Sequence, residues 1–328
     1  MQPYLKSNTT RRGFLSTTAA LGAGALMPAH TEAKPTGIIV DTHMHTWSGD
    51  EAKWPFDHPY TPKGQFTAPE IGATVEHLIE DLDKHGVSHA IIVQTIFHGW
   101  DNTYTVHTIQ QAPNRFKGHG LIDPTDPKVS DKLDYWMTKH GLSGMRFSPI
   151  YYVEGRNGGD AWLTSQAHHR LWKRATELGA VFNMFIHSSQ LPRLGQMVDQ
   201  YPDVKILVDH VSQIDLADDD AQMQLDKLLA LSKFPNVSVK VTDLTSVSPS
   251  KKYPFEEAMP YMRQVYQAFG ADRLLWGTGY PGDVRTHYQR PSLDDELALV
   301  HNQFQFMSEM DKRKYLGLNA QKLWNLET

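Results

Sequence analysis

The sequence contains no cysteine among its 328 residues. This absence excludes disulfide bonds, zinc sites with thiolate ligands and catalysis by a thiol nucleophile. Any metal ion that the protein binds must therefore be held by histidine and carboxylate side chains. The chain also lacks a G-x-G-x-x-G segment after its first predicted strand, which argues against an open dinucleotide-binding sheet.

Long runs of lysine and arginine are also missing, and the formal net charge is −5 with a pI near 6.4. These values give no electrostatic footprint for nucleic acid, so we expect no nucleic-acid partner. With 40% hydrophobic and 21% charged residues, the composition is that of a soluble globular protein that can bury one large core. No internal repeat of solenoid length is visible, and a single domain is expected.

The amino-terminal segment carries a pattern of its own. Arg11 and Arg12 precede a weakly apolar stretch over residues 15–27, which is followed by small residues. This pattern resembles a twin-arginine export signal, because the stretch is too short and too rich in glycine and alanine for a permanent transmembrane helix. We predict cleavage near Ala33, which makes residues 1–33 a signal peptide. The expected localisation is periplasmic or exported, with no membrane partner after cleavage.

Residues 34–328 show a regular alternation of strand and helix patterns. Eight apolar or β-branched runs are separated by stretches with helical periodicity, which is typical of parallel strands. Eight strands close a (β/α)8 barrel, so we expect a single-domain TIM barrel. The first helix is predicted to begin at a capping box of Thr67 and Glu70 and to end at Gly86. The predicted strands cover residues 37–47, 87–95, 116–123, 142–149, 181–189, 204–212, 237–243 and 273–281.

The first of these strands leads into a cluster of ligand-type side chains. The segment GIIVDTHMHTW over residues 37–47 places Asp41, His43 and His45 two positions apart, and therefore on one face of a strand. Neutral imidazole is a common ligand of Zn²⁺, and two imidazoles on adjacent same-face positions can reach one ion. The spacing indicates a metal site at the carboxyl end of this strand.

Other polar side chains are expected at the same end of the barrel, where barrel enzymes place their chemistry. His187 and His210 end the fifth and sixth strands, Arg146 lies in the fourth, and Asp243 ends the seventh. Each has a structural alternative: Asp243 suits a helix cap, and Arg146 an internal ion pair. Substrate contacts are expected from residues near strand ends, namely Trp47, His98, Asn102, Arg146 and Tyr151.

Several segments resemble the amidohydrolase superfamily, in the amidohydrolase-2 branch that includes 2-pyrone-4,6-dicarboxylate lactonase and other lactone hydrolases. They are DTHMH, VQTIFHGWDN, GLIDP, GMRF, FIHSS, LVDH and LGLNAQKLW. The resemblance implies that His43, His45 and His187 hold a divalent metal, with Zn²⁺ favoured and Mn²⁺ second. It also implies that His210 is either a further ligand or the group that orients water and the substrate carbonyl.

One position departs from the family pattern. The eighth strand of the family normally carries an Asp that acts as general base, whereas this chain reads WGTGYPGD with Gly279 there. Either Asp283 or Asp243 replaces that carboxylate, or the site works without it, or the protein is not a hydrolase. Glycine at this position would also allow a ligand to approach the backbone closely.

These features favour a metal-assisted lactonase acting on a small acidic lactone, such as a pyrone dicarboxylate or a carboxylated or sulfonated muconolactone from aromatic-compound breakdown. A guanidinium such as that of Arg146 would grip the substrate anion in a bidentate fork. A metal-dependent decarboxylase of unsaturated or aromatic acids and a non-catalytic ligand-binding barrel are the alternatives. A homo-oligomer is compatible with the sequence.

Overall fold

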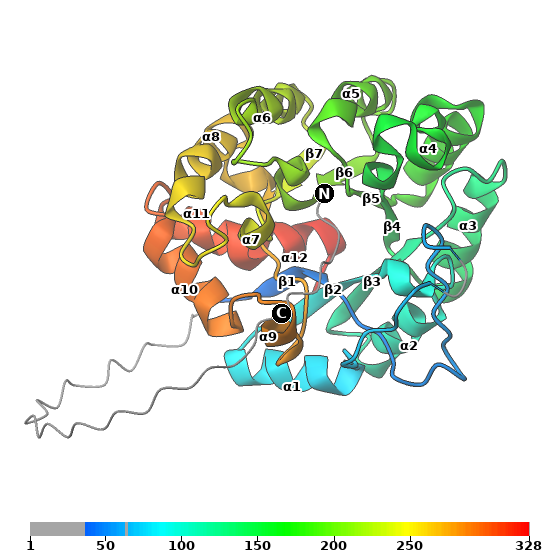
Figure 1. Cartoon of the computed structure of the whole chain (residues 1–328), viewed down its shortest axis with the longest axis horizontal. Coiled ribbons are helices and arrows are strands. Elements are labelled where there is room, and N and C mark those ends of the chain that lie inside the picture. The colour runs from blue at the N-terminus through cyan, green and yellow to red at the C-terminus, as the bar shows by residue number, and fades with distance from the viewer. Residues whose placement is uncertain (1–36, 63–64, 328) are drawn as a thin grey trace, which may run out of the picture. The chain divides into compact units, whose positions relative to one another are not determined.

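The computed structural model describes residues 37–62 and 65–327. Within these ranges, eight parallel strands follow one another in chain order around a ring, which confirms the predicted barrel architecture (Figure 1). The predicted signal peptide at residues 1–33 lies outside the described residues. The strands are β1 (Val40–Met44), β2 (His89–Val93), β3 (Phe116–Leu121), β4 (Gly144–Phe147), β5 (Val181–Met184), β6 (Lys205–Val208), β7 (Val237–Lys240) and β8 (Leu274–Leu275).

The ring closes between β1 and the segment that follows β8. The Thr42 amide donates to the Trp276 carbonyl (3.0 Å), the Gly279 amide to the His43 carbonyl (2.7 Å), and the His45 amide to the Gly279 carbonyl (2.8 Å). These bonds continue the parallel ladder beyond the two residues of β8. The closure therefore fixes the backbone of His43 and of His45, which directly follows β1.

Gly277 is required by this closure. A Cβ atom at position 277 would lie 2.8 Å from the His43 backbone nitrogen and 2.9 Å from the His43 Cβ. Such contacts are too short for carbon atoms, so any side chain here would push the two strands apart. The glycine lets β8 approach the residue that carries the first imidazole of the site.

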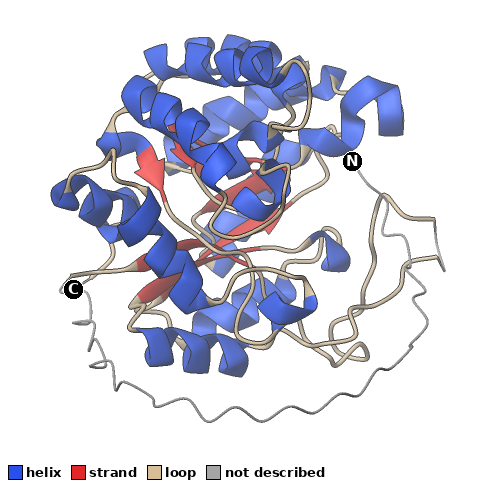
Figure 2. Ribbon diagram, turned by 60° about the vertical axis from the view of Figure 1, so that its left-hand side comes forward, coloured by secondary structure: helices blue, strands red, loops and turns tan. Residues whose placement is uncertain are grey.

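Helices surround the strands on the outside of the ring (Figure 2). Of the helices in the described ranges, none has the length and apolar character that crossing a membrane requires. The α-helices are α1 (Val75–His85), α2 (Thr103–Gln111), α3 (Val129–His140), α4 (Gln166–Leu178), α5 (Leu191–Gln200), α6 (Ala221–Leu229), α7 (Leu244–Val247), α8 (Met259–Phe269), α9 (Val284–His287), α10 (Leu293–Gln303), α11 (Glu309–Arg313) and α12 (Asn319–Trp324).

The predicted start of the first helix is wrong. Helix α1 begins after Thr74, whose hydroxyl accepts from the His77 amide, and not at Thr67. The reason is that Ala73 forms a bridge with Trp47 and keeps the preceding chain extended. The predicted end is confirmed, because Gly86 caps the helix in the left-handed conformation with φ of 70°.

The floor of the barrel, at the amino-terminal ends of the strands, is covered by α12. Trp324 packs with the interior residues Val40, Leu207 and Leu275 in an apolar cluster. Its indole Nε1 donates to Nε2 of the buried His119 (3.0 Å). The site must therefore lie at the opposite end, where the carboxyl ends of the strands open.

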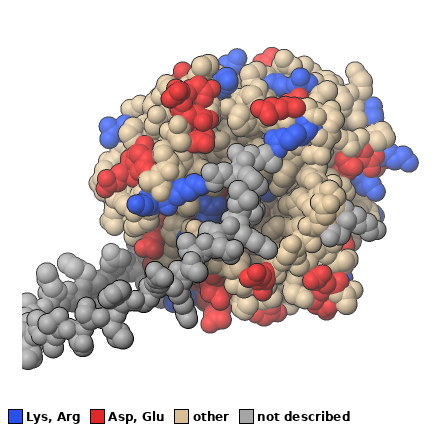
Figure 3. Space-filling view, viewed as in Figure 1, with Lys and Arg blue, Asp and Glu red and all other residues tan. Residues whose placement is uncertain are grey.

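On the face of the molecule in Figure 3, acidic and basic side chains are interspersed.

Candidate metal and active site

The side chains of His43 and His45 turn toward one another at the carboxyl end of β1. Their Nε2 atoms lie 3.3 Å apart. Two imidazoles that share one tetrahedral ion, each with a Zn–N bond of about 2.0–2.1 Å, would hold their nitrogens about 3.3 Å apart. The pair therefore fits a zinc-like ion in position and in donor type.

The hydrogen bonds of His45 leave the correct nitrogen available for a metal. Its Nδ1 lies 2.7 Å from the Val93 carbonyl, which can only accept, so Nδ1 carries the proton and Nε2 keeps its lone pair. Nδ1 of His43 lies 3.2 Å from the Lys240 ammonium and 3.5 Å from Oδ1 of Asp209.

Both imidazoles are held in their neutral form. Burial and, to a lesser degree, the nearby Arg146 guanidinium lower the pKa of His45 to about 3. Burial also places the pKa of His43 well below its ordinary value, with Lys240 acting in the same direction. Neutral imidazole is the form that binds metal, so the site is prepared for an ion at neutral pH.

His210 enters the site from a left-handed turn. It belongs to the segment η5 (Asp209–Gln213), in which His210, Val211, Ser212 and Gln213 all have φ between 51° and 61°. This conformation costs an L-residue roughly 1–2 kcal/mol. Strain of this kind gathers where function requires a particular side-chain direction. The turn brings the His210 ring centroid within 4.4 Å of that of His43.

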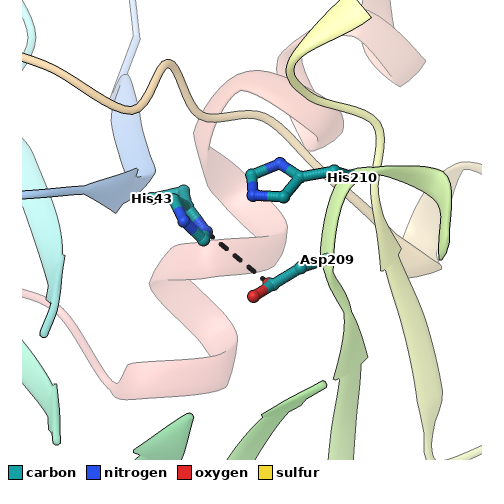
Figure 4. A group of neighbouring side chains, drawn as sticks. All are labelled: His43, Asp209 and His210. Carbon is teal, nitrogen blue, oxygen red and sulfur yellow. Dashed lines mark ion pairs between the residues drawn. The ribbon is translucent and has the colours of Figure 1, made fainter. Parts of the chain in front are cut away.

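Asp209 lies beside these histidines, and Figure 4 shows its carboxylate below both rings. One atom each of His43, Asp209 and His210 lie within 4.8 Å of one another, and this is the one group of metal-ligating side chains with such spacing in the described ranges. However, Asp209 already contacts Lys240 (3.4 Å) and Arg146 (3.1 Å). Burial opposes its ionisation, but Lys240 and His43 hold the pKa of Asp209 well below its ordinary value. We infer that Asp209 balances charge beneath the site.

A small cavity of about 40 Å³ opens above the histidines. Its floor is made of imidazoles, and one basic guanidinium, that of Arg290, contributes to its wall. A Cβ atom at Gly279 would meet no atom within 4 Å, so the space that the family Asp would occupy is open. The lining residues are His43, His45, His210, Thr242, Asp243, Thr278, Gly279, Tyr280 and Arg290.

The structure does not bring the other predicted ligand and acid into this group. His187 is half-buried and caps a short turn after β5, with its Nδ1 2.8 Å from Ser189 Oγ. Asp283 is exposed at the start of α9. Asp243 does line the cavity, and its carboxylate is paired with Arg290.

The predicted substrate-binding residues lie mostly in packing positions. The Trp47 indole donates to the Ile71 carbonyl (2.8 Å), and His98 Nδ1 lies 3.1 Å from the Pro55 carbonyl. Asn102 bonds both backbone groups of Leu121 at 2.7 and 2.8 Å. Tyr151 stacks on Tyr60 with ring centroids 4.4 Å apart. None of the four is among the described residues that line the cavity.

Arg146 is buried and engaged beneath the cavity. Its Nε donates to Asp209 (3.1 Å), and its guanidinium stacks over Phe185.

Sequence reasoning missed Asp209, Lys240 and Arg290. A lysine inside the apolar run of β7 was a usable signal for Lys240, because an unpaired charge in a buried strand is costly. Nothing in the sequence distinguishes Arg290 from other loop arginines.

Comparison with known proteins identifies the family. The amidohydrolase family model matches residues 40–326. The chain belongs to the amidohydrolase family. It is 24% identical over 286 residues to a 4-sulfomuconolactone hydrolase of Hydrogenophaga intermedia, which covers 87% of this chain and 88% of the relative.

Two further proteins are similar to this amidohydrolase, one in sequence and one in fold. The L-fucono-1,5-lactonase of Burkholderia ambifaria is 31% identical over 245 residues, covering 74% of this chain and 80% of the relative. A crystal structure of a probable 2-pyrone-4,6-dicarboxylic acid hydrolase of Acinetobacter baumannii, with citric acid bound, aligns with a TM-score of 0.69 and 23% identity. It covers 88% of this chain and 99% of that one. The structural likeness concerns the fold.

Proposed function

We propose that this amidohydrolase hydrolyses a small acidic lactone, of the pyrone dicarboxylate or of the carboxylated or sulfonated muconolactone type, in the breakdown of aromatic compounds. The observation that carries the proposal is the pair of facing Nε2 atoms of His43 and His45 beside His210, at the open end of the barrel. The relatives that are lactone hydrolases support an enzyme acting on an ester bond.

The residues suggest how the reaction would proceed. A divalent ion held by His43 and His45 would polarise the lactone carbonyl and make water at the site more acidic. Nδ1 of His210 lies 2.7 Å from the Thr242 hydroxyl, which leaves Nε2 for the cavity. We assign Nε2 of His210 as the acceptor of the proton from the attacking water. That proton then passes to the ring oxygen when the carbonyl–oxygen bond breaks, giving an open-chain hydroxy acid.

The assignment of His210 follows from the missing strand-eight carboxylate. With Gly279 in place of Asp, the described lining residues offer Asp243 and the imidazoles as bases, and Asp243 is paired with Arg290. Burial lowers the pKa of His210 to about 4, so its ring is neutral at neutral pH and its Nε2 carries a free lone pair. Zinc is the metal proposed, since nitrogen donors in a tetrahedral arrangement favour it, and manganese is the second choice.

A panel assay tests the proposal. Pyrone dicarboxylate, muconolactone and neutral sugar lactones are followed by pH-stat, and aromatic acids are followed for release of CO₂. The expected result is acid release from anionic lactones together with bound metal by elemental analysis. CO₂ release without lactone opening would instead establish a decarboxylase. No metal, and no hydrolysis after zinc or manganese is added, would indicate a ligand-binding barrel.

The proposed export route has its own test. The twin-arginine pattern predicts a mature protein that begins near Lys34 in the periplasmic fraction. Replacing Arg11 and Arg12 with lysine should retain the uncleaved chain inside the cell, as seen by fractionation and amino-terminal sequencing. Unchanged export of that variant would contradict the twin-arginine assignment.

A further inference from the structure

Among the described residues that line the cavity, Arg290 is the one arginine, and no lysine is among them. It lies in the loop between α9 and α10, and its guanidinium Nη1 approaches Oδ1 of Asp243 to 2.5 Å. Its Nη2 donates to the Ser246 hydroxyl (3.1 Å). A guanidinium has five N–H donors, so these two partners do not exhaust its capacity. Asp243 and Ser246 hold the planar group at the edge of the histidine cavity.

Gly279 leaves part of the cavity lining without a side chain. It has φ of 101°, and a Cβ atom at this position would have no atom within 4 Å. The family pattern places a carboxylate in that space, and this chain leaves it open. Among the described lining residues, the carboxylate that remains is that of Asp243, which is already paired with the Arg290 guanidinium. The guanidinium donors that Asp243 and Ser246 do not use favour an anion from outside.

The other arginine near the site does not compete for this role. Arg146 is 7% exposed and ion-paired with Asp209 below the imidazoles. Moving it to a substrate would leave Asp209 buried with one cation fewer, at a considerable cost. Arg290 has a side chain that is 21% exposed, and it can take a second partner without such a loss.

We propose that Arg290 is the residue that selects anionic substrates, by binding a carboxylate or sulfonate of the lactone in the open space above Gly279. This inference rests on the proposed lactonase function and names its substrate class more closely. Asp243 acts as a positioning residue for the guanidinium. The side chain of Arg290 is 21% exposed at the wall of this cavity, so a ligand can reach its guanidinium from solvent.

The first test measures binding separately from catalysis. Pyridine-2,4-dicarboxylate is a non-hydrolysable mimic of an acidic pyrone, and its diamide is the neutral counterpart. By calorimetry, Arg290→Gln should weaken binding of the dicarboxylate about 10- to 100-fold and change that of the diamide less than about threefold. Arg174→Gln is the matched control, because Arg174 is paired with Asp134 on the outer surface. It should change neither affinity.

The second test changes charge at constant shape. Gly279→Asp and Gly279→Asn carry the same backbone strain and nearly the same volume, so their difference isolates the carboxylate. If an anion of the substrate occupies this space, Asp should lower the affinity for the dicarboxylate at least about tenfold more than Asn does. The two variants should bind the diamide equally.

The outcomes separate this inference from the proposed function. Equal loss for the dicarboxylate and the diamide in Arg290→Gln, or wild-type protein that does not prefer the dicarboxylate, would overturn the role of Arg290. Dicarboxylate binding that depends on Arg290 in a protein that opens no lactone would support the anion site and refute the lactonase. If the protein hydrolyses lactones and Arg290→Gln leaves kcat/KM unchanged for both anionic and neutral lactones, the lactonase function is supported and the role of Arg290 is refuted.

Discussion

At the scale of single residues, the site depends on the buried ammonium group of Lys240. Lys240 is fully buried, and its ammonium bonds the Thr42 carbonyl (2.7 Å) while it faces Asp209 and His43. Burial lowers the pKa of Lys240 to about 8, and Asp209 acts against this fall. Lys240 and Arg146 together neutralise Asp209, which leaves the nitrogens of His43 and His45 available for the proposed metal.

His210 is expected to act in proton transfer and not in metal binding. His210→Asn should keep the metal and lower kcat by about 10²- to 10⁴-fold, since general base catalysis is worth that much. His43→Ala should lose both metal and activity while the fold is unchanged. Elemental analysis, circular dichroism and pH-stat kinetics check these outcomes. Loss of metal in His210→Asn would make it a ligand.

Gly277 offers a test of the contact between β8 and β1. Gly277→Ala should displace His43, because the added methyl group would lie 2.8 Å from its backbone nitrogen. We expect metal affinity to fall at least about tenfold and stability to fall by about 1–3 kcal/mol, as for other overpacked sites. Gly49→Ala, where an added Cβ meets nothing within 4 Å, is the control. Metal titration and thermal unfolding measure both effects.

At the scale of elements, the left-handed turn after β6 is the strained part of the site. Gln213 has φ of 52°, a conformation that glycine adopts without steric cost. Gln213→Gly should therefore stabilise the protein by about 0.5–1 kcal/mol, the steric relief less the added entropy of the unfolded chain.

The control for this change is Gln196→Gly, in the middle of α5, which should destabilise the protein by about 1 kcal/mol. Urea unfolding measures both. Destabilisation by Gln213→Gly as large as that of Gln196→Gly would show that the turn is not strained.

Strands such as β2 and β6 were predictable because they carry apolar runs that the barrel buries, as in residues 204–212. The start of α1 was not, because the bridge between Ala73 and Trp47 joins segments distant in sequence. His43 and His45 could be predicted as site residues because they lie two positions apart, on one face of a strand. Asp243 lies between β7 and α7 and Arg290 between α9 and α10, and no local sequence pattern predicts that the two residues pair.

At the scale of the whole molecule, buried neutral histidines make stability depend on pH. Burial lowers the pKa of His119 to about 3 and that of His168 to about 4, from an ordinary value of 6.5. The unfolded chain takes up these protons below pH 6.5 and the folded protein does not. Stability is therefore fully present above pH 6.5 and is lost as the pH falls toward 4.

Each such histidine should contribute about 1.4 kcal/mol per pH unit to this loss. His119→Gln removes one of the titrating groups, so the slope of unfolding free energy against pH between 4.5 and 6 should fall by about that amount. Glutamine can still accept from Trp324 and donate to Asn183, as His119 does. Urea unfolding across this pH range checks the slope, and an unchanged slope would refute the assignment.

The floor of the barrel links the order of synthesis to the order of folding. Trp324 lies 205 positions after its partner His119, and α12 leaves the ribosome after all eight strands. Until then, the interior pair of His119 and Asn183 has no indole above it. The floor of the barrel can therefore be sealed only after all eight strands have been made, because its cover is the last helix of the chain that the structure describes.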